Sequence, residues 1–97
     1  MRIDKLLWHL RLARSRNLAQ ALVEQGHIRL NGRRIERSHQ KVDIGDILTI
    51  PLASGVSVIE VLLLPARRGP APEARACYRV LDGTGANPIA AGNEYDT

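Results

Sequence analysis

The chain has 97 residues, of which 14 are basic and 10 acidic, with one cysteine and no phenylalanine. This length suits one compact domain and argues against a two-domain enzyme. A single cysteine excludes an internal disulfide and a multi-cysteine zinc site. The longest apolar run, 61–64, is far shorter than the ~20 residues of a membrane span. The amino-terminal residues lack the apolar stretch of a signal peptide, so we expect a cytoplasmic protein with no membrane partner.

Two helices are predicted at the amino terminus. From Ile3 onward, apolar residues recur at positions i, i+3, i+4 and i+7, which predicts a helix over 4–12. Ser15 is a favourable N-cap and Gly26 suits the left-handed position that ends a helix. A second helix is therefore predicted over 16–25. Because the connection is short, we expect the two helices to fold back on each other as a hairpin.

Beyond the second helix the apolar residues alternate, which is the period of a strand. Asn31-Gly32 supplies the two positive-φ positions of a tight hairpin turn. Together with Pro51, which we expect to end a strand, this pattern predicts a small, mostly antiparallel sheet. Its strands are expected at 28–30, 33–35, 42–46 (a short strand and a turn), 47–50 and 56–64.

The remainder of the chain predicts a connector, a short helix and a tail. Residues 65–72 are irregular, whereas helical spacing predicts a third helix over 72–81 with Cys77 on its apolar face. Residues 83–97 show no periodicity and are expected to be mobile. The expected fold class is α+β, with a two-helix hairpin packed on the sheet. The expected division is a domain at 1–64, a connector and helix packing on it at 65–82, and the tail at 83–97.

Positive charge is concentrated in the first half of the chain. Residues 1–41 hold ten basic and three acidic residues, and residues 42–97 hold four basic and seven acidic ones. Twelve of the basic residues are arginine, whose planar guanidinium matches phosphate. Arg14 and Arg16 flank the start of the second helix, where free amides and the helix dipole attract anions. A nucleic-acid surface is favoured, with separate solvated charges as the alternative.

Other residue types give weaker functional signals. Trp8 is the only tryptophan and is able to stack on an unpaired base, but we favour packing against the long strand or the third helix. His9, His27 and His39 lack metal-ligand spacing and are expected to donate to phosphate or water at the surface. Asp43 and Asp46 suit a turn better than an acid–base pair. No metal, cofactor or catalytic residue is predicted, and the protein is not expected to be an enzyme.

Residues 2–50 resemble the RNA-binding domain first named from ribosomal small-subunit protein S-four. The resemblance rests on Arg2-Ile3-Asp4-Lys5, Arg14-Ser15-Arg16, Gly26-His27-Ile28, Asn31-Gly32 and Gly45-Asp46-Ile47-Leu48. Residues 67–74, followed by Tyr78, are similar to the bacterial fifteen-kilodalton heat-shock protein family.

The resemblance implies an αL-type RNA-binding fold that grips structured RNA through its helix pair and hairpin. It also implies a ribosome-associated, heat-shock-response protein that recognises ribosomal RNA on free large subunits carrying a nascent chain on transfer RNA and aids their recycling. We expect a monomer. The RNA-contacting candidates that the resemblance implies are Arg2, Lys5, Arg11, Arg14, Ser15, Arg16, Arg29, Asn31, Arg33 and Lys41.

Three other functions stay open at this point. A DNA-binding helix-turn-helix would read bases with residues such as Gln20 on the second helix, although the arginines cluster at the helix start. The same RNA-binding module accompanies RNA-modifying enzymes, but the 47 residues after Ile50 are too few for their catalytic domain. The apolar strand at 56–64 is an alternative site for protein interaction.

Overall fold

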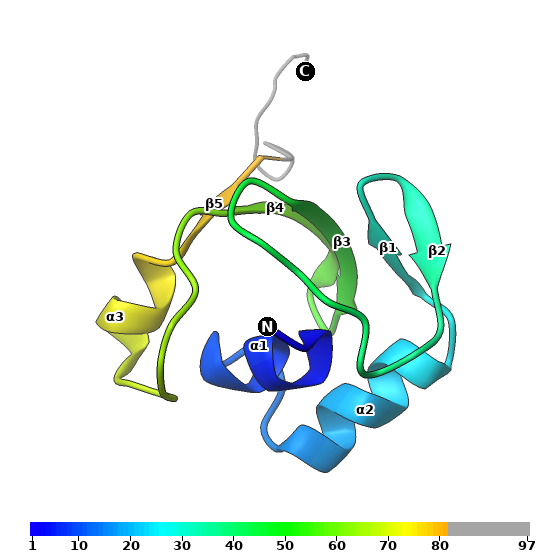
Figure 1. Cartoon of the computed structure of the whole chain (residues 1–97), viewed down its shortest axis with the longest axis horizontal. Helices are drawn as coiled ribbons and strands as arrows, with labels where there is room; N and C mark the ends of the chain where they lie inside the picture. Colours follow the sequence, from blue (N-terminus) through cyan, green and yellow to red (C-terminus); the bar gives the residue numbers. More distant parts are fainter. Residues whose placement is uncertain (82–97) are drawn as a thin grey trace.

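The computed structural model describes residues 1–81, in which a curved sheet arches over a pair of helices (Figure 1). Every strand pair in the sheet is antiparallel, and the strand order is β2-β1-β3-β4-β5. The expected α+β class and antiparallel sheet are confirmed. The elements are α1 (Ile3–His9), α2 (Arg16–Glu24), β1 (Ile28–Leu30), β2 (Arg33–Ile35), β3 (Ile47–Leu52), β4 (Gly55–Val61), α3 (Ala71–Arg75) and β5 (Tyr78–Val80).

The helix hairpin forms with the expected signals at both ends of α2. The Ser15 hydroxyl accepts a hydrogen bond from the Leu18 amide at 3.1 Å, and Gly26 follows the helix with a φ of +78°. α1 ends at His9, earlier than predicted, because the backbone at Arg11 is left-handed with a φ of 62° and a right-handed helix does not continue through that conformation.

The strand pairing confirms the hairpin and corrects the end of β3. Asn31 and Gly32 have φ angles of 51° and 83°, as a two-residue hairpin turn requires. β3 continues through Pro51, so the prediction that Pro51 ends this strand is wrong. Pro51 pairs with β4 on one side, whereas β1 reaches only to Thr49 on the other. Proline is tolerated where its missing N–H faces an open sheet edge.

The predicted helix over 72–81 is wrong beyond Arg75. Tyr78 and Val80 instead lie in β5, opposite Val61 and Ile59 of β4. Aromatic and β-branched residues favour strands, and β4 offers an unpaired edge that β5 covers. β4 itself ends at Val61, three residues before the predicted end.

Residues 42–46 form a turn, so the short strand expected there is wrong. Gly45 has a φ of +91°, and the Asp43 amide donates to Asp46 Oδ2 at 2.8 Å. This turn leads into β3 and confirms the turn role expected for the two aspartates. Val42, just before it, is fully buried and is held by the backbone of Met1 instead of by a strand.

The core lies between the helix pair and the inner face of the sheet. Cys77 is buried as expected, and its burial, followed by the nearby Glu73 carboxylate, raises the pKa of its thiol. Within residues 1–81 no helix is long and apolar enough to cross a membrane. The expected tail at 83–97 lies outside the described residues, and the division at residue 64 stays a prediction. The fully buried aliphatic residues are Ile3, Leu6, Leu7, Ala19, Val23, Ile28, Val42, Leu48, Ile50 and Val61.

Candidate nucleic-acid interface

Asp4 is a buried carboxylate that ties the start of α1 to α2. Its side chain has 0% exposure. It accepts hydrogen bonds from Arg2 Nε and Nη2 at 3.1 and 2.9 Å, from Gln20 Nε2 at 3.1 Å and from the Lys5 amide at 2.7 Å. Arg16 Nη2 lies 3.5 Å from Asp4 Oδ2. The buried charge is therefore satisfied, and it holds two guanidinium groups beside each other.

The environment of Asp4 makes the fold sensitive to acid. Burial raises the pKa of Asp4, but hydrogen bonds from Gln20, Arg2 and the Lys5 amide together outweigh burial, so the pKa falls below its ordinary value of 3.8. A carboxyl group whose pKa is lower in the folded chain than in the unfolded chain stabilises the fold at pH values above its unfolded pKa. That contribution is lost as the pH falls below 3.8 and passes through the lowered folded value.

We expect the stability difference between the wild type and an Asp4→Asn variant to narrow with acid. The wild type is more stable near neutral pH, because only the carboxylate accepts all the donors around it. Below pH 3.8 the protonated carboxyl increasingly resembles the amide. Thermal unfolding followed by circular dichroism, from about pH 7 to about pH 2, measures this difference. A difference that stays constant over the whole range contradicts the assigned role.

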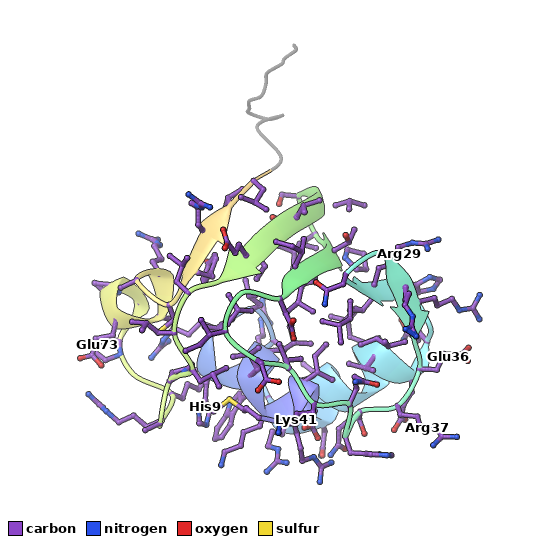
Figure 2. The ribbon with its side chains drawn as sticks, turned by 45° about the horizontal axis from the view of Figure 1, so that its top comes forward. His9, Arg29, Glu36, Arg37, Lys41 and Glu73 are labelled. Carbon is purple, nitrogen blue, oxygen red and sulfur yellow. The ribbon has the colours of Figure 1, made fainter. Side chains whose placement is uncertain are left out.

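The segment before β3 brings a third cation, Lys41, close to Arg2 and Arg16. Arg2 and Lys41 form an isolated antiparallel bridge, and the Ile3 amide donates to the Gln40 carbonyl at 2.8 Å. Lys41 therefore lies next to Arg2. Figure 2 shows Lys41 beside the helix pair. We call Arg2, Arg16 and Lys41 the basic cluster. Lys5 lies on the adjacent turn of α1, and exposed Arg14 precedes the Ser15 cap of α2.

One donor in the basic cluster lacks a partner. The Nε atom of Arg16 is buried, and no residue in the described part of the chain accepts a hydrogen bond from it. A buried donor left unpaired costs about 1–3 kcal/mol. The donors that an anion from outside the chain is able to reach are the free amides at the start of α2 and the Arg2 and Arg16 side chains, which are 48% and 40% exposed.

The hairpin candidates lie on opposite faces of the sheet. Arg29 is opposite Arg34 and Thr49, whereas Arg33 is opposite Leu30. Because side chains alternate along a strand, Arg33 shares the inner face with the core and Arg29 lies on the outer face. In Figure 2, Arg29 lies on the outer side of the hairpin. Of the two hairpin arginines, Arg33 therefore lies on the face of the sheet that covers the helix pair, and Arg29 lies on the opposite face.

Asn31 has a structural role in the hairpin turn. Its Oδ1 accepts the Ile47 amide at 2.8 Å, and its Nδ2 donates to Asp46 Oδ1 at 3.1 Å. Both polar atoms of the side chain are thus used to fasten the hairpin to the start of β3. Asn31 positions the hairpin, and RNA contact by its side chain stays a prediction.

Arg11 lies at the connector and is not joined to the basic cluster. Its Nε donates to the Gly69 carbonyl at 2.7 Å. His9 is buried and lies 3.2 Å from the Pro65 carbonyl through Nδ1, so the surface position expected for His9 is wrong. These bonds fix the connector against the end of α1.

Trp8 is half buried and contacts the connector. The packing against the long strand or the third helix that we expected stays a prediction. The guanidinium of Arg68 lies 6.0 Å from the Trp8 ring centre, and Arg68 Nε donates to the Trp8 carbonyl at 3.0 Å. The sequence did not predict this role of Arg68, because its partner Trp8 lies 60 residues earlier in the chain. Among the described residues, no group of three His, Cys, Asp or Glu side chains is able to hold a metal ion.

Comparisons with known proteins agree with this architecture. The family model described as S4 domain matches residues 1–48. A heat shock protein 15 homolog from Haemophilus influenzae is 32% identical over 79 residues, which cover 81% of this chain and 60% of that protein. The small ribosomal subunit protein uS4 from Listeria monocytogenes is 35% identical over 49 residues, which cover 50% of this chain and 24% of that protein.

A solved structure matches over most of the described chain. It is the trimeric structure of heat shock protein 15 from Vibrio cholerae, with a TM-score of 0.79 and 33% sequence identity. The match covers 84% of this chain and 82% of that one. The chain thus spans most of this solved structure but about 60% of the length of the Haemophilus relative.

Proposed function

Because the chain belongs to the S4 domain family, together with heat shock protein 15, we propose that it is a non-enzymatic RNA-binding protein of the ribosome. The observation that carries this proposal is the basic cluster, in which one buried carboxylate holds two arginines whose side chains remain 48% and 40% exposed. Their planar guanidinium groups match the geometry of phosphate oxygens. Its location is the cytoplasm, where ribosomes work.

The proposed mechanism is electrostatic capture followed by recognition of RNA shape. Phosphate contacts dominate affinity for nucleic acid, and folded RNA is recognised largely through its backbone and 2′-hydroxyls. The proposed phosphate contacts are Arg2, Lys5, Arg14, Ser15, Arg16 and Lys41, and Arg33 is a further proposed RNA contact on the hairpin. Arg11 and Asn31 hold the scaffold in place, and Arg29 extends the positive field on the outer face.

The finer proposal concerns the particle that is bound. The likeness to heat shock protein 15 supports binding to ribosomal RNA of free large subunits that carry a nascent chain on transfer RNA, and a role in recycling them under stress. We propose that a single copy of the chain binds each particle. The trimeric state belongs to the Vibrio protein whose structure was solved.

Sedimentation of tagged protein with ribosomal particles tests the proposal. We expect the chain to migrate with free large subunits, and to do so more strongly when they carry nascent chain–tRNA. A matched sample of an Arg14→Ala/Arg16→Ala variant is expected to remain at the top of the gradient. Migration with small subunits would overturn the choice of particle, and migration with no particle would overturn ribosome binding altogether.

A further inference from the structure

A pocket opens on the inner side of the β1–β2 hairpin. Its volume is about 280 Å³, just below the ~300–1,000 Å³ typical of small-molecule sites, so it suits one flat ring system. The pocket adjoins the basic cluster, because Gln40 directly precedes Lys41 and accepts the Ile3 amide through its carbonyl. The residues that line it are Leu30, Asn31, Arg33, Arg34, Ile35 and Gln40.

The floor of the pocket is aliphatic. Leu30 and Ile35 are half buried, and both share the inner sheet face with fully buried Ile28. Covering their remaining exposed surface with a flat ring removes apolar area from water, which is favourable. A bare phosphate gains nothing from such a floor, because it would lose hydration against apolar carbon.

The polar rim leaves two groups free for a ligand. Asn31 already holds the hairpin turn, and Arg34 pairs with Glu36 at 2.7 Å. Arg33 makes no ion pair or hydrogen bond with any residue between 1 and 81 through its side chain. Gln40 donates through Nε2 to the carbonyl of the next residue at 3.2 Å, so its Oε1 remains available as an acceptor.

We propose that this pocket takes one unpaired RNA base, extruded from a stem whose phosphates lie on the basic cluster. The inference rests on the proposed RNA binding and adds to it a site for a base. The base lies on Leu30 and Ile35, stacks beneath the planar guanidinium of Arg33, and donates an exocyclic amine hydrogen to Gln40 Oε1. Unstacked bases in loops and bulges are the part of RNA that proteins contact in this way.

The test compares two RNA hairpins that differ by one nucleotide. One has a fully paired stem, and the other carries a single bulged 2-aminopurine, whose fluorescence changes when it stacks. Stacking of one base is favourable, so we expect the wild type to bind the bulged stem about tenfold more tightly than the paired stem. A Gln40→Trp variant, which fills the pocket with its own ring, is expected to lose this preference while binding the paired stem as before.

The hairpin offers a matched control for this experiment. Arg33→Ala is expected to reduce the preference for the bulged stem, whereas Arg29→Ala, with the same charge change on the outer face, is expected to keep it. Circular dichroism establishes that each variant is folded. A wild type that binds both stems equally, or a preference that survives Gln40→Trp, overturns the pocket but leaves RNA binding standing. Failure of the wild type to bind either stem overturns the proposed function instead.

Discussion

The Asp4→Ala variant is expected to lose about 3–5 kcal/mol of unfolding free energy, the usual effect of breaking a buried ion pair from one side. Asp4 is fully buried and accepts bonds from two side chains and one backbone amide. Removing it leaves those donors unpaired and places two guanidinium groups together without a counter-charge. A small domain has a total stability of about 5–15 kcal/mol, so the variant is expected to be close to unfolding at room temperature.

The chain contains a matched control for this change. Glu36 accepts from Arg34 at 2.7 Å, two residues away, which is the same spacing and nearly the same distance as for Asp4 and Arg2. The Glu36 pair is exposed, so Glu36→Ala is expected to change stability by about 0–1 kcal/mol. Urea unfolding curves of both variants measure the contrast. Similar losses in the two variants would show that burial at Asp4 has no special effect.

The Arg14→Ala/Arg16→Ala variant is expected to lose about one to two orders of magnitude in affinity for ribosomal RNA, since each charged hydrogen bond contributes about 1.5–3 kcal/mol and part of that is regained from water. Each lost phosphate contact lowers the slope of log affinity against log salt by about 0.7–0.9. The double variant is therefore expected to have a slope smaller by about 1.5. The Arg16–Asp4 pair is long, at 3.5 Å against 2.9 Å for the Arg2–Asp4 pair. The variant is therefore expected to stay folded.

Titrations of labelled ribosomal RNA at several salt concentrations measure both quantities. Arg67→Ala/Arg75→Ala removes the same charge from the region of the connector and α3 and is expected to change the slope little. Equal effects of the two double variants would mean that overall charge, rather than the basic cluster, sets the affinity. Competition by duplex DNA that exceeds competition by RNA at the same salt would favour a DNA-binding protein.

The elements that depend on local chemistry were predictable from the sequence. Ser15 and Gly26 mark the two ends of α2, and Asn31-Gly32 forces the hairpin turn, because each of these residues has a strong preference for one backbone conformation. The strand β5, which the sequence pattern predicted as part of a helix, was not predictable in this way. Tyr78 becomes part of a strand because the edge of β4 is available, and that edge exists only in the folded molecule.

The candidate site was predictable in composition but not in arrangement. The excess of arginine before residue 41 indicated a positive surface, yet its focus at Asp4 depends on Gln20 and on pairing between Arg2 and Lys41. These contacts join positions 16 and 39 residues apart, which no local pattern reports. Arg29 and Arg33 lie on opposite faces because of the register of β1 and β2. This separation follows from the position of the Asn31-Gly32 turn, which the sequence does reveal.

The contact between Arg68 and Trp8 gives the molecule an optical reporter of its own. Trp8 is the only indole in the chain, and the guanidinium above its ring belongs to Arg68 of the connector. Its emission therefore responds when the connector separates from α1, whereas far-ultraviolet dichroism responds when the helices and sheet melt. Recorded together in one titration, the two signals distinguish partial opening from global unfolding without any added dye.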